Sequence, residues 1–287
     1  MGVFYKHFDK PIEYYFNRTG PGTNTFNILN TDEARAFGGE LDAVLASLDP
    51  PAGHDQRQRA RTLVQDYRRE WLREQWPTWY DVPDERERVE FALGLIAAFQ
   101  DGPQTLGQIP ALLDQLADHF FNTLGERNAL TLARYLFQVR GLKGAEPDYW
   151  LPQNSNLRAV IEGGRGIPIS LALVYGLVGR RLGYAVTACN WPNHFLATAL
   201  HNGERIVIDC FRGGHCVEAD KFLNLQGPSR EAARLQLEED ASPETIMARV
   251  LKNLVRQYQY IEHFPNAQLM VDLLKDLERR QSSPAKR

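Results

Sequence analysis

The sequence has few cysteines, little excess charge and no long hydrophobic run. Its three cysteines, Cys189, Cys210 and Cys216, are an odd number and lie late in the chain, unlike the disulfide framework of an extracellular protein. No stretch approaches the ~18 uninterrupted apolar residues that a membrane-spanning helix needs, and residues 1–10 lack the apolar core of a signal peptide. A formal net charge of −3 gives no general attraction to nucleic acid or anionic lipid. We therefore expect a cytoplasmic protein with free thiols that binds neither nucleic acid nor membrane.

The composition is that of an ordinary globular protein. Of the 287 residues, 43% are hydrophobic and 24% are charged, so a large core is possible. At roughly 100–200 residues per domain, this length predicts one elaborated domain or two small ones. We expect an N-terminal helical wrap over residues 1–83, a central domain over 84–226 and a C-terminal helical hairpin over 227–287.

The N-terminal part shows two kinds of pattern. Residues 1–30 are aromatic and polar without a clear period, and we expect them to be irregular. A helix should follow Thr31, and a charged helix should span about residues 56–74. In the second helix arginines alternate with carboxylates, which is typical of a solvated face with ion pairs and not of nucleic-acid binding.

The C-terminal part carries clear helix-start signals. Ser242-Pro243 supplies an N-cap followed by proline at the first helical position, so a helix should run from there to about residue 262. Pro265 should begin a last helix. These two helices resemble one tetratricopeptide-type hairpin, which should dock on the main body because a single unit cannot stack on its own kind.

Helical patterns also fill the middle of the chain. We expect helices at about residues 84–100, 107–123 and 127–140, and a further helix from about 169 to 182. The last of these is apolar on every side, which is typical of a helix buried in the centre of a domain. Its N-terminus, near Pro168, directs free backbone N–H groups toward whatever lies beyond it.

A β-hairpin brings a histidine and an aspartate together. Asn202-Gly203 is a strong signal for a two-residue turn, and it fixes a register in which His201 faces Glu204. In that register His194 and Asp209 are diagonal neighbours on one face of the hairpin, within side-chain reach. A carboxylate in this position orients an imidazole and stabilises its charged form. The pair is either a structural contact or part of a catalytic site.

Several linked motifs resemble the transglutaminase-like superfamily. Gly166-Ile167-Pro168 with Leu182-Gly183 resembles its central helix, and Asn193-His194 followed by Ile208-Asp209 resembles its catalytic histidine and aspartate strands. The resemblance is closest to the SirB-type bacterial branch and covers about residues 85–262. It implies an α+β fold: a helix-rich, papain-like domain with a small antiparallel sheet, plus flanking helices.

The resemblance also shows one departure. Counted back from Gly183, the position of the superfamily's nucleophilic cysteine falls on Pro168, which carries no nucleophile. Cys210 should project from the opposite strand face, Cys189 lies at an odd offset from His194, and Cys216 lies beyond the glycines at 213 and 214. Ser170 is the nearest hydroxyl, and it is either a nucleophile in a Ser–His–Asp arrangement or a first-turn structural residue.

No metal or cofactor is expected. Cys189 and His194, or Cys210 with His215 and Cys216, can be drawn as a zinc site, but neither spacing is that of a usual chelating turn. Free buried thiols are the preferred interpretation.

Two functions remain open. The first is a degenerate, non-enzymatic binding or regulatory module with a protein or peptide partner, whose cleft lies between Pro168 and the His194–Asp209 face and is lined by Asn154, Trp191 and Asn193. The second is a hydrolase, amidase- or peptidase-like, in which His194 and Asp209 act with Ser170 or with an activated water. The oligomeric state does not follow from the sequence.

Overall fold

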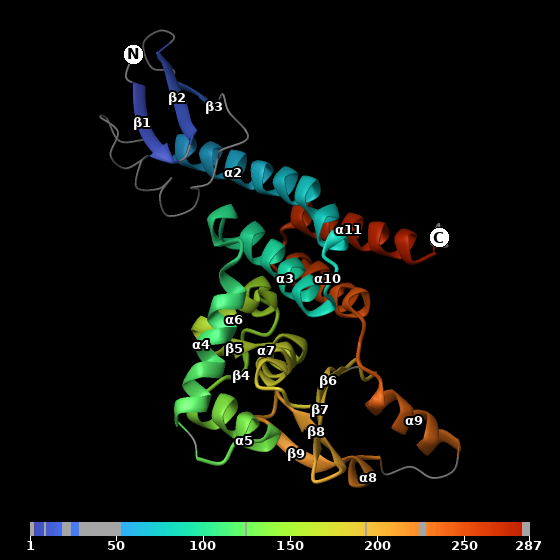
Figure 1. The fold of residues 1–287 in the computed structure, drawn as a ribbon. Coiled ribbons are helices and arrows are strands. Elements are labelled where there is room, and N and C mark those ends of the chain that lie inside the picture. The colour runs from blue at the N-terminus through green and yellow to red at the C-terminus, as the bar shows by residue number, and fades with distance from the viewer. Residues whose placement is uncertain are drawn as a thin grey trace. The chain divides into compact units, whose positions relative to one another are not determined.

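The computed structural model (Figure 1) describes residues 3–8, 10–18, 24–28, 53–123, 125–192, 194–223 and 228–282. The chain divides into two compact units. The first comprises Met1–Glu74 and Ala98–Thr105, and the second comprises Gln75–Ala97 and Leu106–Arg287.

The first unit contains a sheet that the sequence pattern did not predict. Strands β1 (Val3–Phe8), β2 (Lys10–Arg18) and β3 (Asn24–Ile28) pair antiparallel in the order β1-β2-β3. Our expectation of an irregular segment is therefore wrong for these residues. The phenylalanine, tyrosine and isoleucine side chains in them favour strands even without regular alternation. The helix expected after Thr31 lies outside the described residues.

Helix α2 (His54–Gln75) confirms the charged helix of the first unit. Arg69 pairs with Asp66 and Arg73 pairs with Glu70, each about one turn apart along the helix. These pairs belong to the ion-paired face that the sequence pattern indicated, whereas Arg68 is buried and donates to the Gln100 carbonyl oxygen at 2.6 Å. A short 3₁₀ turn, η3 (Pro103–Thr105), also belongs to this unit.

The second unit is built around helix α7 (Pro168–Arg181), which is buried on every side as predicted. Helices α4 (Gln108–Thr123), α5 (Ala129–Arg134) and α6 (Leu157–Gly163) contact it on one side, and the first two strands of a sheet contact it on the other (Figure 1). This layered packing places the N-terminal end of α7 next to the loops that carry the candidate site.

The sheet of the second unit has four antiparallel strands in sequence order. They are β6 (Val186–Cys189), β7 (Leu196–His201), β8 (Glu204–Asp209) and β9 (His215–Glu218). His201 pairs with Glu204, which confirms the predicted hairpin register. Asn202 and Gly203 have φ of 52° and 83°, as a two-residue turn of this type requires. Strand β9 was not predicted, because Gly213-Gly214 reads as a loop and the strand that follows is short.

The remaining elements of the second unit are mostly short. They are η2 (Trp76–Asp81), α3 (Glu85–Asp101, whose last turn belongs to the first unit), the π-turn η4 (Tyr135–Val139), the bridge between β4 (Lys143–Gly144) and β5 (Arg165–Gly166), η5 (Pro152–Ser155), α8 (Ala219–Phe222) and α9 (Pro228–Glu238). The helix expected at 127–140 is thus α5 followed by a π-turn.

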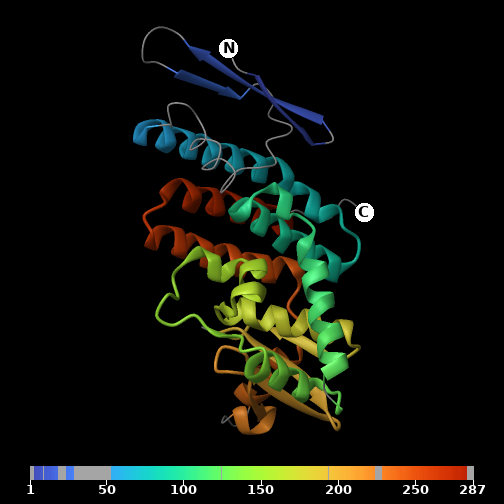
Figure 2. The same ribbon diagram turned by 90° about the vertical axis from the view of Figure 1, so that its left-hand side faces the viewer.

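Two C-terminal helices pack side by side along their lengths (Figure 2). They are α10 (Pro243–Tyr260) and α11 (Phe264–Ser282). The Ser242 hydroxyl accepts the backbone N–H of Thr245 at 3.2 Å, which confirms the predicted N-cap. Helix α10 also contacts η5, where the buried Ser155 hydroxyl donates to Gln257 Oε1 at 2.7 Å. This bond joins the hairpin to the loop that precedes α6.

Candidate functional site

His194 and Asp209 form the centre of the candidate site. The Nε2 atom of His194 lies 3.1 Å from Oδ1 of Asp209. Asp209 is the last residue of β8, and His194 lies two residues before β7 begins, so the hairpin register brings the two side chains together. Both side chains are partly buried, with exposed fractions of 28% and 18%.

The surroundings of Asp209 hold it in the ionised form. Burial alone would raise its pKa, but the hydrogen bond and charge of His194 and the backbone N–H of Arg212 together lower the pKa of Asp209. That N–H donates to Oδ1 at 3.1 Å. An ionised carboxylate only accepts hydrogen bonds, so Nε2 of His194 must carry the donated proton. In the neutral imidazole Nδ1 is then the basic nitrogen.

An open cleft of about 660 Å³ lies beside this pair. Its lining residues are Gly144, Glu146, Tyr149, Pro168, His194, Phe211 and Arg212. The cleft therefore brings together the first residue of α7 and the histidine. One wall is aromatic, because the Tyr149 and Phe211 rings lie 5.8 Å apart. A side chain at Gly144 would collide with Phe211, so this close approach requires glycine.

Ser170 is used in the local structure of the α7 N-terminus. Its hydroxyl lies 2.7 Å from the Asn154 carbonyl oxygen and 3.0 Å from the Ile167 carbonyl oxygen, and it accepts the Ile167 N–H at 3.0 Å. The residue is only 3% exposed. These bonds make Ser170 a capping residue that ties the start of α7 to η5.

The other expected cleft residues have different positions. Asn154 is buried, and its amide donates to the backbone carbonyls of Asp148 and Tyr149 at 2.5 and 3.3 Å. It therefore holds the loop whose Tyr149 lines the cleft. Trp191 packs against Phe222 with ring centroids 5.4 Å apart, beside a cluster of apolar residues. Asn193 lies outside the described residues.

The cysteines lie away from the cleft lining and are not activated. Cys189 and Cys210 are fully buried and all three thiols are free. Burial raises the pKa of Cys189 to about 12 and raises that of Cys210 well above its ordinary value. Burial also raises the pKa of Cys216. At neutral pH these thiols are therefore protonated and poor nucleophiles.

The described residues hold no cluster of three or more His, Cys, Asp or Glu side chains that could bind a metal ion. Among those residues, no helix combines the length and the apolar character needed to cross a bilayer.

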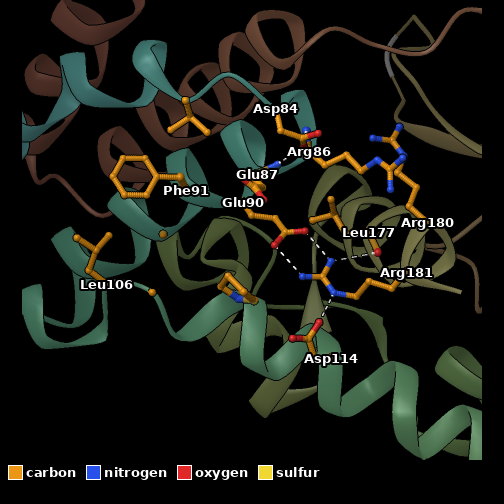
Figure 3. A pocket seen from close by; sticks show the side chains of 14 residues that line it. Asp84, Arg86, Glu87, Glu90, Phe91, Leu106, Asp114, Leu177, Arg180 and Arg181 are labelled. Atoms are coloured by element: carbon orange, nitrogen blue, oxygen red, sulfur yellow. Dashed lines mark hydrogen bonds and ion pairs between the residues drawn. The ribbon is translucent and has the colours of Figure 1, made fainter.

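A second groove lies at the opposite end of α7, by Arg181 (Figure 3). Arg181 makes a bidentate contact with Glu90, at 2.6 and 2.8 Å, and donates to Asp114 at 2.6 Å. The groove also has a volume of about 660 Å³ and a mixed apolar and ion-paired lining. Arg181, Glu90 and Asp114 satisfy one another there, so we regard this groove as a structural junction of α3, α4 and α7.

Sequence reasoning missed five residues of the cleft: Gly144, Glu146, Tyr149, Phe211 and Arg212. Phe211 and Arg212 directly follow the Ile208-Asp209 motif, so their closeness to Asp209 was the available signal. Tyr149 and Glu146 lie in a loop before η5, and no periodic pattern places such a loop.

Comparisons with known proteins give a superfamily and several relatives for this chain. The profile of the Transglutaminase-like superfamily matches residues 104–252. A "UPF0162 protein" of Xylella fastidiosa (strain Temecula1) is 33% identical over 150 residues, which are 50% of this chain and 53% of that protein. The "F-box only protein 21" of Mus musculus is 34% identical over 76 residues, which are 26% of this chain and 12% of that protein.

The chain spans about half the length of the UPF0162 relatives that it matches. No solved structure matches it. The superfamily profile covers more than half of the chain and includes α7, His194 and Asp209. The chain belongs to the Transglutaminase-like superfamily.

Proposed function

We propose that this chain is a degenerate transglutaminase-like protein that binds a protein or peptide partner in the His194 cleft and does not form a covalent intermediate. One observation carries the proposal. Pro168, which the sequence resemblance aligns with the superfamily's nucleophile, lines the same cleft as the His194–Asp209 pair.

The other potential nucleophiles support the same conclusion. The Ser170 hydroxyl is bonded to two backbone carbonyls, and burial keeps the thiols protonated. A nucleophile needs an adjacent base within hydrogen-bond reach. Within the described residues, the His194 ring makes its side-chain hydrogen bond to the Asp209 carboxylate and not to a hydroxyl or thiol.

The proposal includes the finer assignments that the sequence suggested. These are membership of the SirB-type branch, a tetratricopeptide-like role for α10 and α11 and a cytoplasmic location. They also include the division into an N-terminal part (1–83), a transglutaminase-like domain (84–226) and a C-terminal hairpin (227–287). The contact of α10 with η5 supports the docking of the hairpin on the cleft-bearing body.

A second function is favoured by the orientation of His194. Because Nε2 donates to Asp209, Nδ1 is the nitrogen that would take a proton from water in a hydrolase. General-base catalysis alone supplies about 10²–10⁴-fold, so this mechanism would also need an oxyanion site. The backbone N–H groups in the first turn of α7 would have to provide it.

The test restores the missing group. In a Pro168→Cys variant, the new thiol should lie beside His194, form a thiolate–imidazolium pair and be alkylated by iodoacetamide at pH 7 at least about tenfold faster than Cys216. Adding His194→Ala should abolish the difference. Rates are read for each cysteine by peptide mass spectrometry.

The control is Ile167→Cys, which places a thiol at a buried neighbouring position and should react slowly. Slow alkylation of the Pro168→Cys thiol in a protein that melts as the wild type does would show that this position is not a vacant nucleophile site. Measurable peptide-bond hydrolysis by the wild type, lost in His194→Ala, would favour the hydrolase instead.

A further inference from the structure

A continuous row of aromatic rings leads out of the His194 cleft. The rings of Phe211 and Tyr149 lie 5.8 Å apart, those of Tyr149 and Trp150 5.0 Å apart, and those of Trp150 and Tyr260 6.4 Å apart. Phe211 and Tyr149 line the cleft, whereas Tyr260 is the last residue of α10. The row therefore connects the cleft with the turn between α10 and α11. We call these four residues, with Ile261 and Phe264 at that turn, the aromatic strip.

The far end of the aromatic strip is exposed. Tyr260 is 65% exposed and Phe264 63%, whereas Ile261 and Trp150 are 41% and 38% exposed. Single exposed apolar residues are common, but a group of four adjoining a cleft marks an interaction surface. Trp and Tyr are also the residue types that contribute most to the affinity of protein interfaces.

Two arginines give the strip a positive edge. Arg249, Arg256 and Tyr260 follow one face of α10, because their spacings of seven and four residues each bring the helix back to the same side. Both guanidinium groups act on Tyr149: burial raises the pKa of that residue, and the charges of Arg249 and Arg256 oppose the rise. Arg249 has a long bond to Asn190 Oδ1, at 3.4 Å, and Arg256 is exposed. Both arginines thus flank the part of the strip that leaves the cleft.

We propose that the aromatic strip is the docking surface for an extended, acidic peptide segment with apolar side chains, one end of which enters the His194 cleft. The proposal rests on the binding function proposed above and names the chemistry of the ligand. Its apolar side chains would cover Trp150 and Tyr260, and its carboxylates would pair with Arg249 and Arg256. Bidentate pairing with carboxylates is a property that arginine has and lysine lacks.

Aromatic rings beside arginines also occur where single-stranded nucleic acid binds. The charge of the chain argues against that partner. The formal net charge is −3, and the positive edge of the strip is formed by two arginines, Arg249 and Arg256. A nucleic-acid site would require a wider positive field along the path of the phosphates.

The test is selection from a phage-displayed library of random 12-residue peptides on the full chain. We expect the enriched peptides to combine Asp or Glu with aromatic or aliphatic residues. Their affinity, measured by fluorescence anisotropy, should fall about tenfold or more in Tyr260→Ala and in Arg256→Glu. The control is Leu235→Ala, which removes an equally exposed apolar side chain on α9 and should leave the affinity unchanged.

Three results would overturn the proposal: no enrichment, enrichment of basic peptides, or peptides that bind Tyr260→Ala as tightly as the wild type. Tight binding of a twelve-uridine RNA that is lost in Tyr260→Ala would replace the peptide with nucleic acid. The alkylation of Pro168→Cys uses no peptide, so the two tests are independent. The Pro168→Cys thiol can react slowly while peptides still bind the aromatic strip, and peptide binding can be absent while that thiol reacts rapidly.

Discussion

Asp209 receives two donors at one oxygen, from the ring of His194 and the backbone of Arg212. Asp209 therefore holds the turn at Arg212 in place and also orients the ring of His194. The hairpin register was enough to predict the pair, because a two-residue turn fixes which residues face each other. The role of the Arg212 N–H could not be predicted, since it depends on how the chain turns after the strand ends.

The Asp209→Asn variant should be less stable than the wild type at neutral pH, by about 1–2 kcal/mol, because a charge-assisted hydrogen bond is weakened. The folded-state pKa of Asp209 is lowered, so its contribution is present above the unfolded pKa of ~3.9 and is lost as the pH falls through the folded value. Urea unfolding should therefore show a difference that is full at pH 6–7 and shrinks below about pH 4.

An exposed control, Asp220→Asn, should change stability little at any pH, since its ion pair with Arg230 is on the surface. A difference for Asp209→Asn that is the same at pH 7 and pH 3 would mean that the ionised carboxylate is not what stabilises the fold.

The thiols give a second prediction for single residues. In the native protein, Ellman's reagent at pH 7.5 should react slowly with Cys216 and not measurably with Cys189 or Cys210, because burial raises the pKa of all three thiols and the latter two are inaccessible. In 6 M guanidinium all three should react. Rapid reaction of two or more thiols in the native state would contradict the burial described here.

Helix α7 begins at the His194 cleft and ends at the Arg181 junction. Its all-round apolar sequence predicted its central place, and Pro168 predicted where it starts. Its C-terminal contacts were not predictable, because Glu90 and Asp114 are far away in the sequence and surface charges have no period that identifies their partners. In the structure Arg181 joins α3 and α4 to α7.

Arg181→Ala should lower the free energy of unfolding by about 2–4 kcal/mol, because it leaves the Glu90 carboxylate, 8% exposed, without its bidentate partner. Adding Glu90→Gln should recover part of the loss, since the buried charge is then removed. Arg234→Ala, which breaks an exposed pair on α9, serves as the control and should cost less than about 0.5 kcal/mol. Equal losses for Arg181→Ala and Arg234→Ala in urea titrations would refute the special role of this junction.

The cleft wall depends on a close approach between β4 and the loop after β8. A Cβ atom at position 144 would lie 2.7 Å from the Phe211 ring, so Gly144→Ala should displace that ring from Tyr149. We expect a loss of about 1–3 kcal/mol, as for overpacking elsewhere, and a changed near-ultraviolet circular dichroism signal. Gly163→Ala, where the new methyl group meets no atom within 4 Å, should be neutral or slightly stabilising. An unchanged spectrum for Gly144→Ala would show that Phe211 does not pack there.

For the molecule as a whole, the sequence motifs predicted the superfamily by resemblance. The burial of α7, the hairpin register and the His194–Asp209 pair could be predicted because each follows from a local sequence pattern. The first unit was harder, because its strands lack alternation. The residues that form the walls of the cleft could not be predicted from the sequence either. The loop that carries Tyr149 is positioned by Asn154 and by contacts distant in sequence.

The central claim is that the His194 cleft contains no working nucleophile. It is tested most directly by intact-mass measurement after treatment with a fluorophosphonate and, separately, an acyl-transfer probe for thiols. The wild type and His194→Ala are compared, and Pro168→Cys serves as the positive control for the thiol probe. We predict no adduct on the wild type that depends on His194, and an adduct on Pro168→Cys that does. A covalent adduct at Ser170 of the wild type that disappears in His194→Ala would contradict the claim and make this protein an enzyme.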